Sequence, residues 1–338
     1  MRHKVGVKAL GLLSGGLDST LAVKLMLEQG FEVETLNFVT PFCLCRRKGC
    51  AATNIALKFQ IKLNRIFLGS EYLKMLRKPK HGYGKNLNPC IDCRILMLKK
   101  ARQYAKQIGA DFIFTGEVLD ERPMSQHRRA MKIIEREAGL EGKILRPLSA
   151  KCLPETEAER KGWVEREKLL DIKGRSRKRQ IQLARSFGLL DYPLPAGGCL
   201  LTDREFSAKM RDLFKHKRDL RLKDVSLLKV GRHFRLGSNK IIVGRKETEN
   251  KSLLSLKAPS DYYFEVPGYG SPITILQGRK SSEAIRVAAS LTARYSDAKG
   301  ESVQVAYGTD GSKKTLTVTP LPNEHVDRLR IAWKRKSS

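Results

Sequence analysis

Apolar runs alternate with amphipathic stretches over the first half of the chain. Runs typical of buried strands occur at residues 5–13, 31–38, 65–68, 111–115 and 144–145. Helical spacing of apolar positions predicts helices between them, at residues 20–29, 51–59, 91–108 and 125–138. Gly30, Gly109 and Gly139 stand where three of these helices should end. The alternation predicts an α/β domain with a doubly wound parallel sheet, whose ligand site lies at the carboxyl ends of the strands.

The pattern changes in the second half of the chain. Residues 155–170 and 177–187 have a strongly charged helical pattern, and a Pro/Gly-rich turn at 192–198 leads to Cys199. Residues 203–222 predict a charged helical connector. Short alternating segments at 240–244, 262–266, 274–277 and 315–318 then predict strands, with one helix at about 282–296. We therefore expect an α/β domain over 1–150, a helical linker region over 151–222 that carries Cys199, and an α+β module over 223–338.

Charge and cysteine content narrow the setting in which this protein acts. The chain has 66 Lys and Arg residues and 35 Asp and Glu residues, which gives a formal net charge of +31. This excess of positive charge favours a polyanionic partner such as RNA or DNA. No apolar stretch is long enough to cross a bilayer, and no export signal precedes the first strand. Seven cysteines without such a signal indicate a reducing compartment and thiol or metal chemistry. We expect a cytoplasmic protein with no membrane partner.

Residues Ser14, Gly15, Gly16, Leu17, Asp18 and Ser19 join the first predicted strand to the first predicted helix. Two glycines let the backbone approach an oxyanion, and the free amides of the first helical turn favour negative charge there. The hydroxyls of Ser14 and Ser19 add donors, and Asp18 can hold Mg²⁺ beside a polyphosphate. A glycine turn before a helix occurs in many folds, but it does not require Ser, Asp and Ser at these offsets.

This loop resembles the pyrophosphate loop (PP-loop) of the ATP pyrophosphatases, whose signature is Ser-Gly-Gly-x-Asp-Ser. The resemblance implies an adenine nucleotide alpha hydrolase-like fold and cleavage of ATP between its α and β phosphates, with Mg²⁺ near Asp18. Adenine would then pack near Leu12, Leu13, Asn37 and Phe38. The ATP-binding residues that we expect are Leu12, Leu13, Ser14, Gly15, Gly16, Asp18, Ser19, Asn37, Phe38 and Gly116.

Cysteines form the second group with chemical potential. Cys90 and Cys93 form a C-x-x-C pair at the start of a predicted helix, where the helix dipole lowers a thiol pKa. Cys199 follows a Pro-Ala-Gly-Gly turn, which suits an exposed and positioned thiol. The three thiols could hold an iron–sulfur cluster with one open iron, form a zinc site that lacks a visible fourth ligand, or act as a nucleophile and resolving pair for a persulfide.

A further group, Cys43, Cys45 and Cys50, follows the second predicted strand. It could bind metal, relay sulfur, or consist of ordinary loop thiols. Cys152 belongs to no motif, and we expect it to be structural.

The order of these motifs resembles that of tRNA thiouridine synthases. The Ser14–Ser19 loop, the Asn-Pro-Cys-x-x-Cys stretch and the Gly-Gly-Cys-Leu-Leu-Thr-Asp-Arg-Glu-Phe stretch around Cys199 are similar to 2-thiouridylases. The Thr-Gly-Glu-Val-Leu stretch at 115–119 and Arg-Pro-Leu at 146–148 are similar to 4-thiouridine synthetases. The resemblance implies ATP-dependent thiolation of a tRNA uridine at C2 or C4, with a sulfide or persulfide donor.

In this family, Cys90 and Cys199 would carry the sulfur-transfer chemistry beside Asp18. A 4Fe-4S cluster would be held by Cys90, Cys93 and Cys199.

The module over 223–338 resembles the RNA-binding domain of NFACT proteins. The similarity rests on Val-Gly-Arg at 243–245, Asp-Tyr-Tyr-Phe at 261–264, Pro-Gly-Tyr-Gly-Ser-Pro at 267–272 and the Ala-Ala-Ser-Leu stretch at 288–291. It implies contact with RNA, in agreement with the net charge. Basic residues that could hold the RNA backbone, or form a solvated helix face, are Arg175, Arg177, Lys178 and Arg179.

Two other interpretations remain open at this point. A zinc-dependent deazaguanine nitrile synthase would share the PP-loop, but its four-cysteine zinc knot fits the spacing of Cys90, Cys93 and Cys199 poorly. A non-enzymatic RNA- or ribosome-binding protein would need none of the loop side chains. The sequence does not determine the oligomeric state, and a homodimer is one of the options.

Overall fold

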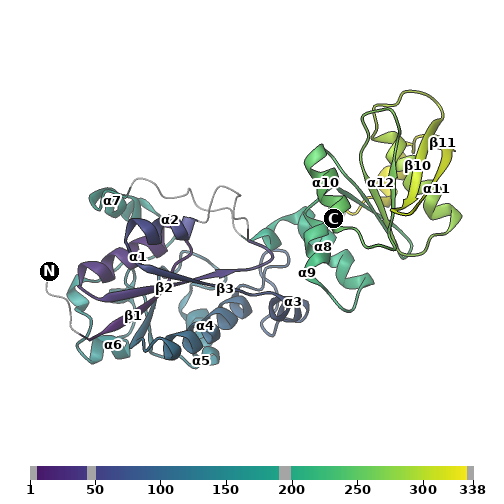
Figure 1. Cartoon of the computed structure of the whole chain (residues 1–338). Coiled ribbons are helices and arrows are strands. Elements are labelled where there is room, and N and C mark those ends of the chain that lie inside the picture. Colours follow the sequence, from purple (N-terminus) through teal and green to yellow (C-terminus); the bar gives the residue numbers. More distant parts are fainter. Residues whose placement is uncertain (1–5, 44–50, 190–198, 333–338) are drawn as a thin grey trace. The chain divides into compact units, whose positions relative to one another are not determined.

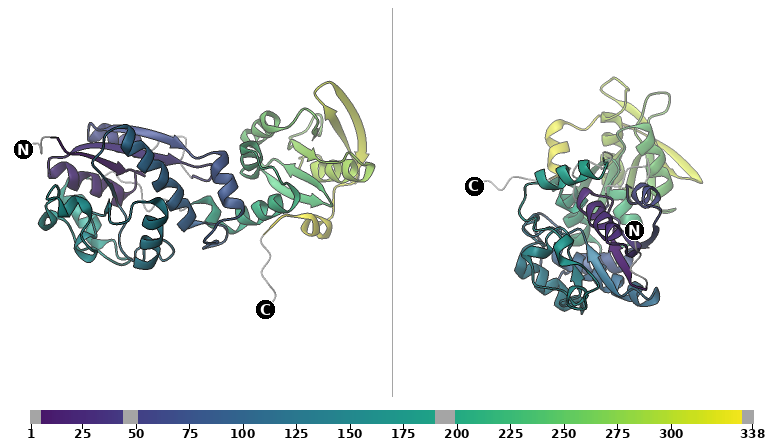
Figure 2. Two further views of the ribbon diagram at one scale, coloured as in Figure 1. Left: turned by 90° about the horizontal axis from the view of Figure 1, so that it is seen from below. Right: turned by 90° about the vertical axis from the view of Figure 1, so that its left-hand side faces the viewer.

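The computed structural model describes residues 6–43, 51–189 and 199–332 (Figure 1). Cys45, Cys50 and the turn at 192–198 lie outside the described residues. Two compact units make up the chain, Met1–Thr202 and Asp203–Ser338, and each has its own sheet (Figure 2).

A five-stranded parallel sheet forms the centre of the first unit. Its strands are β1 (Lys8–Leu12), β2 (Glu32–Val39), β3 (Lys62–Phe67), β4 (Phe112–Thr115) and β5 (Ile144–Leu145). Their order is β3-β2-β1-β4-β5, so the winding reverses between β1 and β4. This order confirms the predicted doubly wound α/β fold and places a ligand site at the carboxyl end of β1.

Helices cover both faces of this sheet because β1 is apolar on both sides. Ala9 and Leu13 pack in the cluster shared with α1 (Leu17–Glu28), α2 (Ala51–Lys58) and α7 (Lys178–Ser186). Leu10 and Leu12 pack against α4 (Cys90–Gln107) and α5 (Arg128–Ala138) on the other face. Each fully buried Leu stabilises the unit by about 2 kcal/mol relative to an exposed one.

Two segments of the first unit differ from the sequence prediction. A short helix, α3 (Ser70–Arg77), precedes α4 and was not expected. The predicted helix at 155–170 is wrong, because α6 (Glu157–Arg160) ends before Gly162, whose φ is +70°, and only a 3-10 turn at Arg166–Lys168 follows. The buried carboxylate of Glu159 accepts hydrogen bonds from the Thr156 amide and hydroxyl, which fixes the short helix as a capping box.

The second unit is built on a six-stranded antiparallel sheet in the order β11-β10-β8-β9-β7-β6. Its helices α9 and α10 pack against one face through Leu227 and Leu253, and α11 packs against the other through Ala284 and Ala288. This arrangement confirms a separate α+β module. Its elements are α8 (Arg204–His216), α9 (Leu222–Leu228), β6 (Arg232–Leu236), β7 (Asn239–Val243), α10 (Glu247–Leu256), β8 (Tyr262–Glu265), β9 (Thr274–Gln277), α11 (Ser282–Arg294), β10 (Val303–Thr309), β11 (Ser312–Val318) and α12 (Asn323–Leu329).

Within the described ranges, no helix combines the length and apolar character that crossing a bilayer requires.

Candidate active site

The loop between β1 and α1 has the backbone of an anion site. Gly15 has φ +80°, and a Cβ there would stand 2.4 Å from the Ala52 amide nitrogen, so only glycine fits. Gly16 is the N-cap of α1 and has an extended backbone. It has no side chain that could accept a hydrogen bond from the amides of the first turn. The amides of that turn are therefore left to a ligand, and an anion is the ligand that they favour.

Polar side chains around this loop hold its shape. The hydroxyl oxygens of Ser14 and Ser19 lie 3.1 Å apart, and Ser19 Oγ donates to the Gly16 carbonyl at 3.0 Å. Asn37 Nδ2 donates to the Leu13 carbonyl at 2.8 Å, which ties the end of β2 to the end of β1. These contacts give the three side chains a positioning role in the loop itself.

Gly116 follows β4 and touches the same loop. A Cβ at this position would lie 2.4 Å from the Ser19 amide nitrogen and 2.6 Å from the Asp18 carbonyl carbon. Because both neighbours are backbone atoms, β4 can approach α1 this closely only through glycine.

Asp18 lies in a partly buried group of charges. Arg177 Nη2 is 3.4 Å from Asp18 Oδ2, while Oδ1 has no hydrogen-bond partner among the described residues. Burial raises the pKa of Asp18, against the opposing charges of Arg177 and Arg122. The pKa of Glu121 is likewise raised by burial and then by Asp18. A cation near Asp18 Oδ1 would relieve this accumulation of negative charge.

The change Asp18→Asn is therefore expected to raise the midpoint of thermal unfolding at pH 7.5 by about 2 °C. The folded state has a raised carboxyl pKa, so ionisation of Asp18 costs stability above its unfolded pKa of about 3.9 and costs nothing well below it. Calorimetry should show the gain at pH 7.5 and its decline toward pH 4. Asp219→Asn, on an exposed side chain, is the control. A lower midpoint for Asp18→Asn at pH 7.5 would contradict this account.

The predicted thiols occupy two segments that hydrogen bonds bring together. Cys90 is the first residue of α4, and Cys93 lies one turn further. The Leu87 amide donates to the Leu201 carbonyl at 3.2 Å, and Asn86 Nδ2 donates to the Thr202 carbonyl at 2.7 Å. The segment that carries Cys199 is thus held against the loop that precedes α4.

Cys43 joins the same neighbourhood. The Leu200 amide donates to the Phe42 carbonyl at 3.1 Å, which places the loop after β2 beside Cys199. Burial raises the pKa of Cys199 to about 12, and the thiols of Cys93, Cys43 and Cys90 add to the shift. Burial also raises the pKa of Cys93 to about 11, despite a hydrogen bond with Tyr72, and it raises the pKa of Cys90. Four thiols therefore influence one another across this site. The prediction of a lowered thiol pKa at the start of α4 is wrong, because burial outweighs the effect of the helix dipole.

The possible metal ligands here are thiols, which bind soft metals. Three thiols from two tethered segments are the ligands that an iron–sulfur cluster with one open iron requires. In the part of the chain that the structure describes, no three His, Cys, Asp or Glu side chains stand at the separations that a single ion requires.

Glu117 links the thiols to the loop. It follows Gly116 directly, and its carboxylate pairs with Arg94 of α4 at 3.3 Å and with Arg146 at 3.0 Å. Burial alone would raise the pKa of Glu117, but these two guanidinium groups hold it below its ordinary value. The exposed Arg122 acts electrostatically on both Asp18 and Cys90. The first turn of α4 and the loop at 14–19 therefore share one charged network at the carboxyl edge of the sheet.

Sequence reasoning missed four residues of this network: Tyr72, Arg94, Glu117 and Arg122. It also missed Asp92, inside the C-x-x-C pair, whose carboxylate accepts from the amides of Lys80 and His81 at 2.9 and 3.0 Å. Asp92 and Arg94 lie within and beside the C-x-x-C pair, and Glu117 and Arg122 lie within and just after the stretch at 115–119, which was the available signal; no motif marked Tyr72.

The remaining candidate residues fall into two groups. Leu12 and Leu13 are buried in the core, and Phe38 packs against it, so any contact of adenine with this edge would use the backbone or the rim of the sheet. Arg175, Lys178 and Arg179 are exposed, and Arg179 pairs with Asp171 at 2.6 Å. Arg177 differs from them because it turns toward Asp18. Binding of ATP or RNA by these residues stays a prediction.

Curated relatives share part of this chain. The tRNA-specific 2-thiouridylase MnmA of Pseudomonas savastanoi pv. phaseolicola is 30% identical over 131 residues, which are 36% of this chain and 35% of that protein. MnmA of Leptospira interrogans is 30% identical over 127 residues, 32% of this chain and 33% of that protein. The chain thus spans about a third of the length of these relatives.

Two solved structures are also similar. A 4-thiouridine synthetase in complex with RNA and ATP has 22% identity and a TM-score of 0.35, covering 56% of this chain and 53% of that one. The U34-tRNA thiolase NcsA from Methanococcus maripaludis, with its 4Fe-4S cluster, has 16% identity and a TM-score of 0.33, covering 63% of this chain and 68% of that one.

Family models match one segment in each of the two units. Residues 5–152 match the family described as thiamine biosynthesis protein (ThiI), and residues 231–330 match the NFACT protein RNA binding domain. The first unit is thus similar to the ThiI family and the second to the NFACT RNA-binding domain, and neither match spans half of the chain.

Proposed function

We propose that this protein is an ATP-dependent tRNA sulfurtransferase that replaces a uridine carbonyl oxygen with sulfur. The observation that carries the proposal is electrostatic: the charge of Arg122 acts on both Asp18 of the anion loop and Cys90, and the thiols of Cys90 and Cys93 act on Cys199. The ThiI family match and the MnmA relatives support the same chemistry.

In the proposed first step, the loop binds the polyphosphate of ATP, and Asp18 holds Mg²⁺. The amides of the first turn of α1 neutralise the charge that moves onto the leaving pyrophosphate. The uridine carbonyl oxygen attacks the α-phosphorus, the bond to the β-phosphate oxygen breaks, and pyrophosphate leaves. The product is a uridine whose carbonyl carbon carries a good leaving group, AMP.

In the second step, sulfur attacks that carbon and the carbon–oxygen bond to AMP breaks. With sulfide as the sulfur source, the step needs no oxidation or reduction. With a persulfide on Cys90 or Cys199, a second thiol must supply two electrons and ends in a disulfide. When bound by Cys90, Cys93 and Cys199, a 4Fe-4S cluster would offer an open iron for sulfide.

The second unit supports RNA as the substrate. Its NFACT match is accompanied by lysines on aromatic rings of β8, with Lys313 Nζ 5.4 Å from the Tyr263 ring and Lys280 Nζ 5.4 Å from the Tyr262 ring. Paired cations and aromatic faces are the groups that RNA phosphates and bases contact.

The deciding experiment uses protein purified without oxygen, unmodified tRNA, ATP, Mg²⁺ and sulfide. We expect tRNA-dependent release of pyrophosphate and a thiouridine in the nucleoside digest, detected by mass spectrometry. Failure to release pyrophosphate with any cellular tRNA would overturn the proposal. Iron analysis and visible absorption of the same sample test the cluster: iron-free protein that still thiolates tRNA from sulfide would need neither a cluster nor a persulfide, and the persulfide route would be tested with a persulfide donor in place of sulfide.

A further inference from the structure

The first unit has a cavity beside α5 and β5 that the chemistry above does not use. Its volume is about 880 Å³, and its walls come from α5, β5 and residues 141–160. The apolar part of its surface, the floor, comes from the partly exposed Ile133 and Leu153 and the exposed Pro154, with the buried Met131, Ile144 and Leu145 behind them. The charged side chains that line it are Arg128, Arg129, Lys132, Arg136, Arg146 and Arg160, together with Glu135, Glu141, Glu155 and Glu159.

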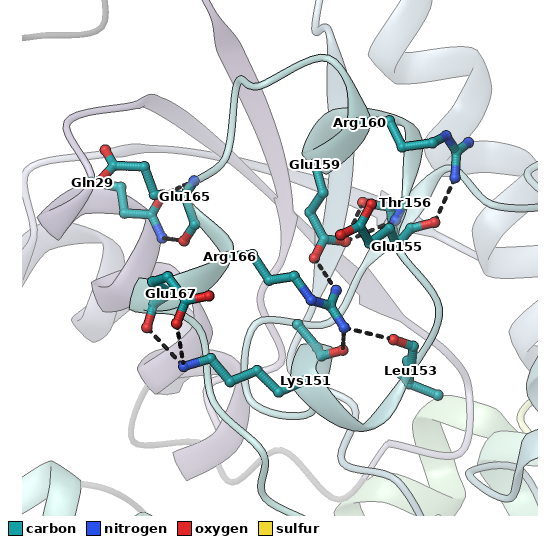
Figure 3. A network of polar contacts seen from close by, with 11 residues as sticks. Gln29, Lys151, Leu153, Glu155, Thr156, Glu159, Arg160, Glu165, Arg166 and Glu167 are labelled. Carbon is teal, nitrogen blue, oxygen red and sulfur yellow. Dashed lines mark hydrogen bonds and ion pairs between the residues drawn. The ribbon is translucent and has the colours of Figure 1, made fainter.

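The acidic members of this lining are partly neutralised within the protein. Glu135 pairs with Arg146, and its other oxygen accepts from the Gly142 amide at 3.2 Å. Glu159 pairs with Arg166 and accepts from Thr156 (Figure 3). The exposed Glu141 and Glu155 remain, so the cations that face the cavity outnumber the available carboxylates.

One cation is buried at the cavity and is incompletely satisfied. Arg146 is 4% exposed, and it donates through Nε to Glu117 and through Nη1 to Glu135. Its Nη2 atom is buried and has no hydrogen-bond partner among the described residues. A buried guanidinium nitrogen without a partner costs free energy unless a ligand or water accepts from it. Its preferred partner is an oxyanion.

Two exposed arginines stand at the rim in fixed positions. Arg128 Nη2 donates to the Cys152 carbonyl at 2.7 Å, and Arg160 Nη1 donates to the Glu155 carbonyl at 2.6 Å (Figure 3). Each uses a single nitrogen for the contact, so several N–H groups of each guanidinium stay available.

The wall that carries these contacts is itself fixed. Arg166 Nη2 donates to the carbonyls of Ala150 and Leu153 at 3.0 and 2.9 Å, which ties residues 150–153 to the segment after α6 (Figure 3). A cavity of this size with a rigid wall does not need to form anew around a ligand.

We propose that this cavity is a second nucleotide site, separate from the loop at 14–19. A phosphate would accept from Arg146 Nη2, Arg128 and Arg160, and a base would pack on Ile133, Leu153 and Pro154. An apolar floor beneath cationic donors matches a flat, weakly polar base joined to a phosphate. The nucleotide could be free or could be one residue of a bound RNA, since both present the same groups. This inference does not depend on the sulfur chemistry.

The test measures binding of radiolabelled UMP and AMP to the full chain by equilibrium dialysis, and binding at the loop at 14–19 is separated by variants that change the cavity alone. Two variants leave the buried Arg146 network intact. Arg128→Glu with Arg160→Glu reverses the rim charge, and Leu153→Trp fills the cavity from its partly buried wall. Lys99→Glu, on the exposed side of α4 and outside the cavity, is a charge-reversal control at a single position.

We expect both cavity variants to lower the affinity for UMP or AMP at least 10-fold, with Lys99→Glu within 2-fold of the parent. If only an RNA oligonucleotide loses affinity by this amount, the occupant is an RNA residue, which also supports the site. The proposal is overturned if the cavity variants bind UMP, AMP and the RNA oligonucleotide as tightly as the parent does. It is also overturned if inorganic phosphate binds as tightly as UMP, because the floor would then hold no base.

Discussion

Replacement of Gly116 with alanine is expected to lower ATP-dependent pyrophosphate release about 100-fold. Moving catalytic groups by about 1 Å from their reacting geometry has an effect of this size. The added Cβ would stand 2.4 Å from the Ser19 amide nitrogen and 2.5 Å from its Cα. Both atoms are backbone, so no side chain can turn away. The start of α1 must shift from β4, and with it the amides that face the polyphosphate. Overpacking of this kind also lowers the free energy of unfolding by about 1–3 kcal/mol.

Stopped-flow detection of pyrophosphate, together with urea unfolding, separates the catalytic from the folding effect. Gly311→Ala is the control for stability, since a Cβ there meets nothing within 4 Å. Gly16→Ala is a second comparison, because its Cβ meets only Ser14 Oγ at 3.5 Å. It should fold like the parent and lose nucleotide binding alone. Unchanged pyrophosphate release in Gly116→Ala would show that the α1 amides do not bind the polyphosphate.

The sheet of the first unit could be predicted because its signals are local. Five apolar runs separated by amphipathic segments leave few topologies, and the observed order β3-β2-β1-β4-β5 is one of them. The same reading of local patterns predicted a helix over residues 155–170, and that prediction was wrong. Its charges look like a solvated helix face, but Glu159 is buried and bonded to Thr156 and Arg166, and Gly162 ends the helix. A charge pattern does not reveal which charges will find partners inside.

In the candidate site, too, features that are local in sequence could be predicted and contacts between distant residues could not. The loop at 14–19 is continuous in sequence, so its backbone could be foreseen. Glu117 and Arg94 meet because α4 lies against the end of β4, and no spacing rule places residues 23 positions apart in one ion pair. For Arg177, the prediction relied too much on its neighbours in the sequence. It was grouped with exposed basic neighbours, yet its side chain turns inward to Asp18, 159 positions earlier in the chain.

Serine in place of Cys199 is expected to reduce thiouridine formation at least about 1000-fold while pyrophosphate release stays within about 3-fold of the parent. The hydroxyl can neither carry a persulfide nor bind an iron–sulfur cluster as a thiolate does. The fold should persist, because the segment is held through the Leu201 and Thr202 carbonyls and the Leu200 amide rather than through the thiol. Adenylation precedes the sulfur step, so the adenylated uridine or its hydrolysis products should accumulate with AMP.

Cys152→Ser controls for the loss of a thiol. Its Sγ donates to the Asp171 carbonyl at 3.2 Å and lies outside the group formed by Cys43, Cys90, Cys93 and Cys199, so thiolation should be retained. Mass spectrometry of nucleosides and a pyrophosphate assay on one reaction mixture give both readouts. Equal loss of pyrophosphate release and thiouridine in Cys199→Ser would place this thiol in nucleotide or RNA binding. Full thiolation by Cys199→Ser would remove it from the sulfur step and leave Cys90, Cys93 and Cys43 as the reacting thiols.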